Sequence, residues 1–244
     1  GIVTGSSVFI AQFWGKRDRE NIRKIIGISL TLSSILGLIF TLVVLLFPES
    51  IMKIFSKDVE VIQLGTEYLL IVVFSYIITG ISFTYAVASR SIGQAKLPMM
   101  VSIISFVTNA LFNYLLIFGK FGFPRLGIRG AAYGTLIARI VEVLLILFAI
   151  YSDTTSPLAG NIKEMTNWNK NFIKKYFITT YPVMINEALW SLGNVMYSVA
   201  YSKIGTEASA SIQILNTTYN LFMVLARGMA NACTVRSEER RVGK

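Results

Sequence analysis

The chain has 244 residues, of which 54% are hydrophobic and only 15% are charged, whereas a soluble domain usually carries about 25% charged residues, so an ordinary water-soluble fold is excluded. The net charge of +10 does not indicate nucleic-acid binding, because Lys and Arg lie in short segments between long apolar runs, where anionic lipid headgroups are their simplest partner. There is no His and Cys233 is the only Cys, which excludes a His-ligated metal, a Cys–His catalytic pair and an intrachain disulfide.

Long apolar segments dominate the chain, and a helix of about 20 such residues crosses a bilayer. Helices are expected rather than strands, because a helix satisfies its own backbone hydrogen bonds in lipid. Residues 1–13 resemble the final half of a further span, since the chain has no initiating Met and Gly1 begins inside an apolar run. The predicted fold class is therefore an all-α, polytopic transmembrane helix bundle, truncated at both ends, with spans at 25–47, 61–88, 98–118, 130–151, 176–202 and 207–233.

Polar breaks between these spans predict how the chain is divided. Pro48 stops the first full span, and Gly/Pro-rich turns occupy 93–98 and 119–127. The longest polar segment, 152–175, is expected to be a cytoplasmic linker between an N-terminal lobe (1–151) and the start of a C-terminal lobe (176–235). Within the linker, 161–169 is predicted to lie at the membrane interface as a short amphipathic helix anchored by Trp168.

The last nine residues, 236–244, end an apolar helix abruptly. They resemble the in-frame translation of a common sequencing-adapter oligonucleotide. We expect this tail to be non-native, the alternative being a genuine polar C-terminus.

Lys and Arg are unevenly divided between the two sides of the predicted bundle. Segments 14–24, 89–97 and 152–175 hold 11 of these residues, whereas 48–60, 119–129 and 203–206 hold 6. The positive-inside rule places the first set in the cytoplasm.

Six segments of the chain carry a resemblance to a known family, and they are 11–18, 90–99, the pair Asn109 and Asn113, 119–132, 182–187 with Trp190, and 205–208. In this order they resemble segments of the multidrug and toxic compound extrusion (MATE) family. The resemblance runs from late helix two to helix eight of twelve, so that helix one and helices nine to twelve are absent. It implies a MATE-like, two-lobed inverted V.

Glu187 is the strongest single candidate for a functional residue. It lies deep within a predicted span, where a charge costs several kcal/mol and is expected to face a cavity or a partner. A carboxylate whose charge a proton or a sodium ion can cancel suits coupled transport, and family members use a helix-seven carboxylate near this position. The alternative is a protonated Glu that bonds a neighbouring helix.

Uncharged polar residues within spans are candidates for lining a central cavity, or for hydrogen bonds that hold neighbouring helices together. Aromatic residues could supply a surface for a lipophilic cation, or serve as packing. The polar candidates are Asn109, Asn113, Asn186, Gln213 and Asn216, and the aromatic ones are Phe112, Tyr114, Trp190, Tyr197 and Tyr219.

The leading function is a cation-coupled secondary antiporter, driven by Na⁺ or H⁺ and without any other cofactor, that exports organic cations or amphiphilic drugs by alternating access. It is expected to be a monomeric, multi-pass protein of the bacterial plasma membrane. A membrane-embedded enzyme is disfavoured, since no nucleophile with its base and no ligand cluster is present, and a non-transporting scaffold is a weaker alternative.

The runner-up is a lipid-linked oligosaccharide flippase of related fold, which tends to carry more basic cavity residues. Here only Arg139 and Arg227 are basic within spans. Arg139 is predicted to form a structural pair with Glu142, three residues later, and Arg227 to extend toward the membrane surface. Whether the two arginines face a cavity separates the two functions.

Overall fold

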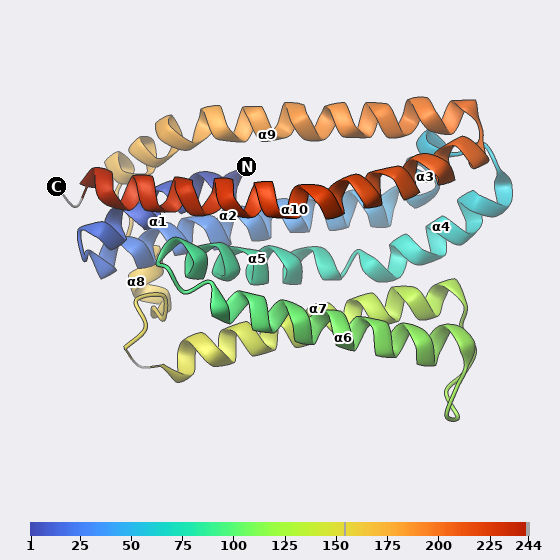
Figure 1. Cartoon of the computed structure of the whole chain (residues 1–244), viewed down its shortest axis with the longest axis horizontal. Helices are drawn as coiled ribbons and strands as arrows, with labels where there is room; N and C mark the ends of the chain where they lie inside the picture. The colour runs from blue at the N-terminus through green and yellow to red at the C-terminus, as the bar shows by residue number, and fades with distance from the viewer. Residues whose placement is uncertain (154, 243–244) are drawn as a thin grey trace.

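The computed structural model describes residues 1–153 and 155–242, and the regular structure among them is entirely helical, as predicted. Figure 1 shows the long helices lying side by side along the long axis of the molecule. The helices are α1 (Ile2–Gly15), α2 (Arg19–Leu46), α3 (Pro48–Phe55), α4 (Val59–Val72), α5 (Ser75–Ser91), α6 (Lys96–Phe118), α7 (Ile128–Ser152), α8 (Ile162–Thr166), α9 (Lys170–Ile204) and α10 (Thr206–Val242).

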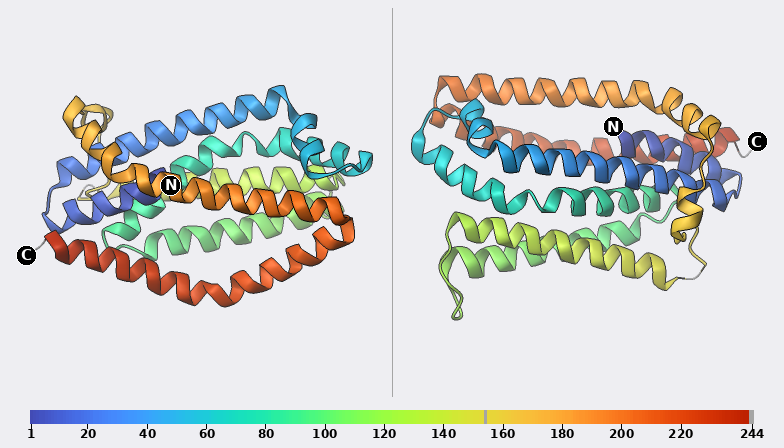
Figure 2. Two further views of the ribbon diagram at one scale, coloured as in Figure 1. Left: turned by 90° about the horizontal axis from the view of Figure 1, so that it is seen from above. Right: turned by 180° about the vertical axis from the view of Figure 1, so that it is seen from behind.

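The helices are arranged so that α9 forms one edge of the bundle and the α6–α7 pair forms the opposite edge (Figures 1 and 2). The α5–α6 turn and α8 lie at one end of the molecule, and α3, the α6–α7 turn and the α9–α10 turn lie at the other. The segments that the Lys and Arg distribution assigned to one side of a membrane are thus gathered at one end.

Capping residues explain where several helices begin and end. The Asp18 carboxylate accepts a hydrogen bond from the Asn21 backbone N–H (3.1 Å) at the start of α2, and Asn169 caps the Phe172 N–H (2.7 Å) at the start of α9. Gly119, at φ 66°, ends α6 in the left-handed region that favours glycine. Pro48 stops α2 as predicted and also begins α3, a short helix that the sequence analysis did not predict.

The predicted continuous span 61–88 is interrupted in the structure. α4 and α5 meet at a bend of 55°. Two hydroxyl groups satisfy carbonyls near the bend: Thr41 on α2 donates to the Val73 carbonyl (3.3 Å), and Ser75 donates to the Val72 carbonyl (2.6 Å). A break in a membrane helix is tolerated where such groups bond the backbone near it. The apolar sequence around this bend did not indicate the break.

Among the described helices, α2, α6 and α7 are long and apolar enough to cross a membrane, and the bent α4–α5 pair could form a fourth span. The predicted spans 176–202 and 207–233 correspond to α9 and α10, which are long enough but do not meet the same apolarity criterion. Asn, Ser and Thr residues interrupt their apolar runs. The predicted spans 176–202 and 207–233 are therefore long helices, but they are less apolar than α2, α6 and α7.

The segment predicted to be a linker is closely packed. Leu158 is fully buried, and Arg23 on α2 pairs with Glu164 on α8 (3.0 Å). A Cβ added to Gly27 would come 1.9 Å from the Met165 carbonyl oxygen, so α8 lies directly on the backbone of α2. This end of the bundle also holds the main cluster of buried apolar side chains.

The predicted non-native tail continues α10 as helix to Val242, and the Gln12 amide donates to the Glu238 carboxylate (2.8 Å). Residues 243–244 lie outside the described residues. The foreign origin of the tail stays a prediction.

Candidate functional site

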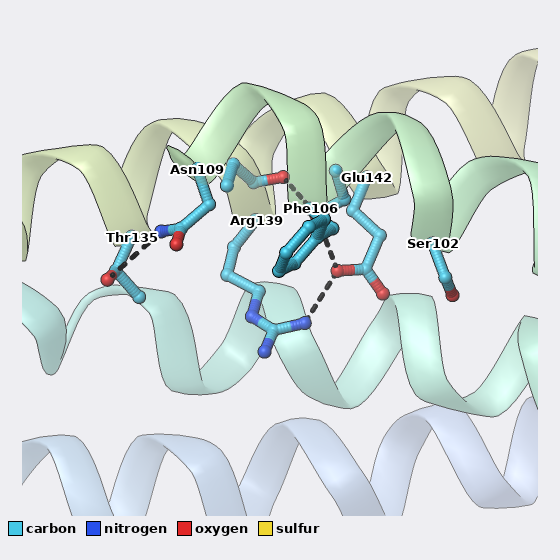
Figure 3. Close-up of a pocket in the computed structure, with 8 residues that line it drawn as sticks. Ser102, Phe106, Asn109, Thr135, Arg139 and Glu142 are labelled. Atoms are coloured by element: carbon cyan, nitrogen blue, oxygen red, sulfur yellow. Dashed lines mark hydrogen bonds and ion pairs between the residues drawn. The ribbon is translucent and has the colours of Figure 1, made fainter. Parts of the chain in front are cut away.

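A pocket of about 360 Å³ lies between α6 and α7, and it is called the α6–α7 pocket below. Residues three or four apart share a helix face, and the lining follows this spacing on both helices. Figure 3 shows the Arg139 and Glu142 side chains leaving α7 toward α5. The lining residues are Ser102, Ser105, Phe106 and Asn109 from α6 and Thr135, Ala138, Arg139 and Glu142 from α7.

Glu142 is the most enclosed charged group of this pocket, with its side chain only 13% exposed. Its carboxylate accepts a hydrogen bond from Arg139 (2.6 Å) and lies 3.3 Å from the hydroxyls of Ser82 on α5 and Ser105 on α6. Each hydroxyl shares its one proton between this carboxylate and a backbone carbonyl, that of Thr79 or Ala138. The predicted Arg139–Glu142 ion pair is therefore confirmed. The contact with Ser82 makes Glu142 a junction of three helices, which the sequence analysis did not anticipate.

A second polar group lies beside the pocket along the same interface, although Asn113 is not one of the lining residues. Asn109 donates to the Thr135 hydroxyl (3.4 Å), and Asn113 donates to the Asn109 amide oxygen (3.1 Å). The Asn113 Oδ1 atom is buried and has no hydrogen-bond partner among the described residues. It lies over Gly134, where an added Cβ would come within 2.2 Å of it. A buried carbonyl oxygen without a donor is suited to accept one from a ligand, or to coordinate a cation.

A larger pocket of about 650 Å³ lies between α9 and α10, and it is called the α9–α10 pocket below. Its lining combines aromatic rings, amides and one arginine. Three of the predicted cavity residues meet here, namely Trp190, Gln213 and Asn216. The other lining residues are Asn194, Tyr197, Ser198, Tyr201, Ile212, Leu215, Tyr219, Asn220 and Arg227.

Glu187 and Asn186 lie on α9 outside the lining of both pockets. Glu187 is half-buried, and a Cβ added to Gly1 would come 3.4 Å from the Glu187 Cβ atom. The residue therefore lies beside the start of α1, and it is three residues before Trp190 on the same helix. Asn186 is exposed and precedes Trp190 by four residues, so it extends the lined face by one turn.

Sequence reasoning overlooked several pocket residues that a simple signal could have found. Polar residues at 102, 105, 109 and 113 recur at spacings of three and four along α6. Asn194 and Asn220 each follow a predicted site residue by four positions. Among the aromatic candidates, Tyr197 and Tyr219 line the α9–α10 pocket, whereas Phe112 and Tyr114 line neither pocket.

Both basic residues of the predicted spans line a pocket. Arg139 faces the α6–α7 pocket, and Arg227 faces the α9–α10 pocket rather than only extending toward the membrane surface. Each pocket therefore combines a guanidinium with aromatic and neutral polar groups.

Comparison with known proteins gives consistent results. The MatE family model matches residues 1–115. The chain is 27% identical over 237 residues to the probable multidrug resistance protein YoeA of Bacillus subtilis, covering 96% of the chain and 51% of YoeA. It is 27% identical over 231 residues to the probable multidrug resistance protein NorM of Thermotoga maritima, covering 94% of the chain and 49% of NorM.

Among solved structures, one described as the crystal structure of MATE in the bent conformation is similar, with a TM-score of 0.80 and 21% identity. The similarity covers 99% of the present chain and 53% of that one, and it concerns the fold. The chain thus spans about half the length of the curated relatives it matches.

Proposed function

The chain belongs to the MATE family, and on that premise we propose that it forms part of a cation-coupled antiporter that exports organic cations or amphiphilic drugs. The family consists of transporters and not enzymes, in agreement with the sequence-based prediction. The relatives are named as probable multidrug resistance proteins, which supports multidrug efflux as the activity of the whole protein.

The observation that carries this proposal is the composition of the α9–α10 pocket. Trp190, Tyr197 and Tyr219 present aromatic rings, and a cation over the face of such a ring is attracted by its quadrupole. Gln213 and Asn216 add neutral hydrogen-bonding groups without a fixed charge. A cavity that combines aromatic rings with neutral polar groups and the one guanidinium of Arg227 suits an amphiphilic molecule of small-molecule size.

Two lobes rocking about a central cavity would carry such a substrate across the membrane by alternating access. The proposed driving force is the inward flow of Na⁺ or H⁺. Glu187 is the proposed coupling residue, because it is an acidic side chain on α9 that lies one turn from the aromatic lining. The whole protein is proposed to act as a monomer in the bacterial plasma membrane, with several spans and no other cofactor.

Replacing Glu187 tests the coupling role. In cells that produce the intact transporter, Glu187→Gln keeps the shape of the side chain but cannot bind a proton or a cation by charge. We expect cation-driven efflux of an ethidium-like dye to fall at least about tenfold, since a coupled step needs this charge change, while the protein remains in the membrane.

Glu60→Gln is the matched control, because Glu60 is exposed at the start of α4, and it should leave efflux unchanged. Undiminished efflux by Glu187→Gln, with equal protein in the membrane, would remove Glu187 from the coupling mechanism. Absence of dye export by the intact wild-type transporter would contradict the proposed function.

A lipid-linked oligosaccharide flippase remains the second candidate, because a specific observation favours it. Arg139 and Arg227 both line pockets, and guanidinium groups bind phosphate oxygens well. Two arginines supply little charge for a pyrophosphate, however, and the relatives are named for multidrug resistance. Multidrug export is therefore the preferred proposal.

A further inference from the structure

We propose that the α6–α7 pocket binds the acidic group, a carboxylate or a phosphate, of an amphiphilic ligand, and that Arg139 is the residue that binds it. This inference rests on the proposed function and gives one of its pockets a ligand chemistry. It concerns ligands that carry a negative group, in addition to the cations expected from the aromatic lining of the α9–α10 pocket.

The first step concerns which charge of the Arg139–Glu142 pair a ligand can reach. The Arg139 side chain is 42% exposed, and that of Glu142 is 13% exposed. Both line the pocket, but the carboxylate lies at the junction of three helices while the guanidinium extends beyond it (Figure 3). The accessible charge of the pocket is therefore positive.

The second step concerns hydrogen-bonding capacity. The Glu142 carboxylate accepts from Arg139 and has two serine hydroxyls within 3.3 Å. Its side chain is only 13% exposed, which leaves little room for a ligand cation to reach it. Arg139 has five N–H donors, and its hydrogen bond within the described residues goes from Nη1 to Glu142. The remaining donors form a planar edge that matches the two oxygens of a carboxylate or phosphate.

The third step concerns the fixed position of the guanidinium. A flexible arginine loses conformational entropy when it binds, whereas the 2.6 Å contact with Glu142 already holds Arg139 in place. The pair is neutral as a unit, which makes an arginine tolerable within a membrane helix while the pocket is empty.

The remaining lining completes an amphiphilic site. Phe106 presents an exposed ring beside the ion pair, and the Ser102 hydroxyl is exposed on the same helix face. A volume of about 360 Å³ accommodates an acidic group together with one or two rings. The ligand class is thus an aromatic or apolar molecule that carries one acidic group.

Two dyes that differ only in the acidic group test this inference. The purified chain in phosphatidylcholine nanodiscs is titrated with a rhodamine that carries a free carboxylate and with the methyl ester of the same rhodamine, and binding is followed by fluorescence anisotropy. We expect the acid to bind at least about tenfold more tightly than the ester, as a charge-assisted hydrogen bond would give. Arg139→Gln should abolish this preference and leave the affinity for the ester within about twofold.

Two further variants separate binding from structural damage. The double variant Arg139→Gln with Glu142→Gln leaves no unpaired buried charge and should also lose the preference. Arg129→Gln removes another arginine of α7, which pairs with Glu67 outside the pocket, and should retain it. Equal affinity of the wild-type chain for both dyes, or a preference for the acid that survives in Arg139→Gln, would overturn the inference. Binding of the ester in that case would leave the proposed export function unaffected. If neither dye bound the wild-type chain, both proposals would fail.

The source of the acidic group is resolved by changing the lipid. Replacing part of the phosphatidylcholine by phosphatidylglycerol offers a competing membrane phosphate whose negative charge is not neutralised by choline. If the anionic lipid suppresses acid-dye binding in the wild-type chain but leaves ester binding intact, a lipid headgroup is the occupant. If it has no effect, the carboxylate of a soluble amphiphile is the occupant.

Discussion

At the scale of single residues, Gly130 shows how closely α6 and α7 approach. A Cβ added at this position would come 2.6 Å from the carbonyl carbon and oxygen of Leu116 and 2.9 Å from the Ile117 nitrogen. These are backbone atoms, which cannot rotate away as a flexible side chain can. Small residues at helix contacts are what allow membrane helices to pack tightly.

Gly130→Ala is therefore expected to lower the free energy of unfolding by about 1–3 kcal/mol, the usual cost of overpacking. Thermal denaturation in detergent measures the change. Gly193→Ala on α9 is the matched control, because apart from the backbone of its own helix no atom of the described residues lies within 4 Å of a Cβ added there. It should leave stability unchanged or slightly raise it, through better helix propensity. Similar losses in both variants would show that the close approach of α6 and α7 is not the cause.

The accessibility of Glu142 depends on the helices around it more than on its spacing from Arg139 along α7. The separation of three positions from Arg139 predicted the ion pair correctly. It did not predict that Ser82 and Ser105 would enclose the carboxylate and leave the guanidinium as the reachable group.

At the scale of elements, the bend between α4 and α5 depends on a side chain of another helix. Thr41 on α2 is buried and donates to the Val73 carbonyl at 3.3 Å. The same carbonyl also accepts from the Tyr76 backbone N–H (3.2 Å), so Thr41 supplies a second hydrogen bond that links the bend to α2. The bend and α2 are thus held together by this contact.

Thr41→Val keeps the size of the side chain and removes the donor. We expect the free energy of unfolding to fall by about 0.5–1.5 kcal/mol, as for other hydrogen bonds between membrane helices, with faster hydrogen exchange at residues 73–76. Thr31→Val is the matched control on the same helix, since Thr31 bonds only the Gly27 carbonyl of its own helix. Unchanged exchange at 73–76 in Thr41→Val would mean that the bend does not need the hydroxyl.

At the scale of the whole molecule, a hydroxyl cluster joins the start of α9 to α1 and α2. Ser6 on α1 contacts the Tyr176 hydroxyl at 2.7 Å and the Ser29 hydroxyl of α2 at 2.6 Å. Tyr176 is 1% exposed, whereas the side chains of α9 beyond Thr180 are mostly exposed. The start of α9 is thus anchored to the N-terminal helices while the remainder lines the α9–α10 pocket.

Tyr176→Phe should lower the free energy of unfolding by about 0.5–1.5 kcal/mol, because it removes a buried hydrogen bond and keeps the ring. Chemical denaturation of the reconstituted chain measures this loss. Tyr181→Phe removes a hydroxyl from a side chain that is 59% exposed on the same helix, and it should have no effect. An equal loss in the two variants would contradict an anchoring role for the cluster.

Much of the helical framework could be predicted from local sequence. Long apolar runs, the stop at Pro48 and the turn at Gly119 locate α6 and the end of α2 closely, because each signal acts within a few residues of the chain. The start of α2 at Arg19 lies six residues before the predicted start at 25, because its first turns are polar and charged. The bend after Val72 and the short α3 were missed. The residues around the bend are apolar, and the groups that permit it include Thr41, some thirty residues earlier.

The sequence alone was sufficient to indicate a membrane-embedded helical protein of the MATE family and to nominate the polar residues within its spans. Helical spacing predicts which side chains share a face of a helix, but it does not predict which other helix packs against that face. Only the tertiary structure therefore placed Trp190, Gln213 and Asn216 in one pocket and left Glu187 beside α1. For the same reason, only the packing of α5 and α6 around α7 decided that Arg139, rather than Glu142, is the charge a ligand can reach.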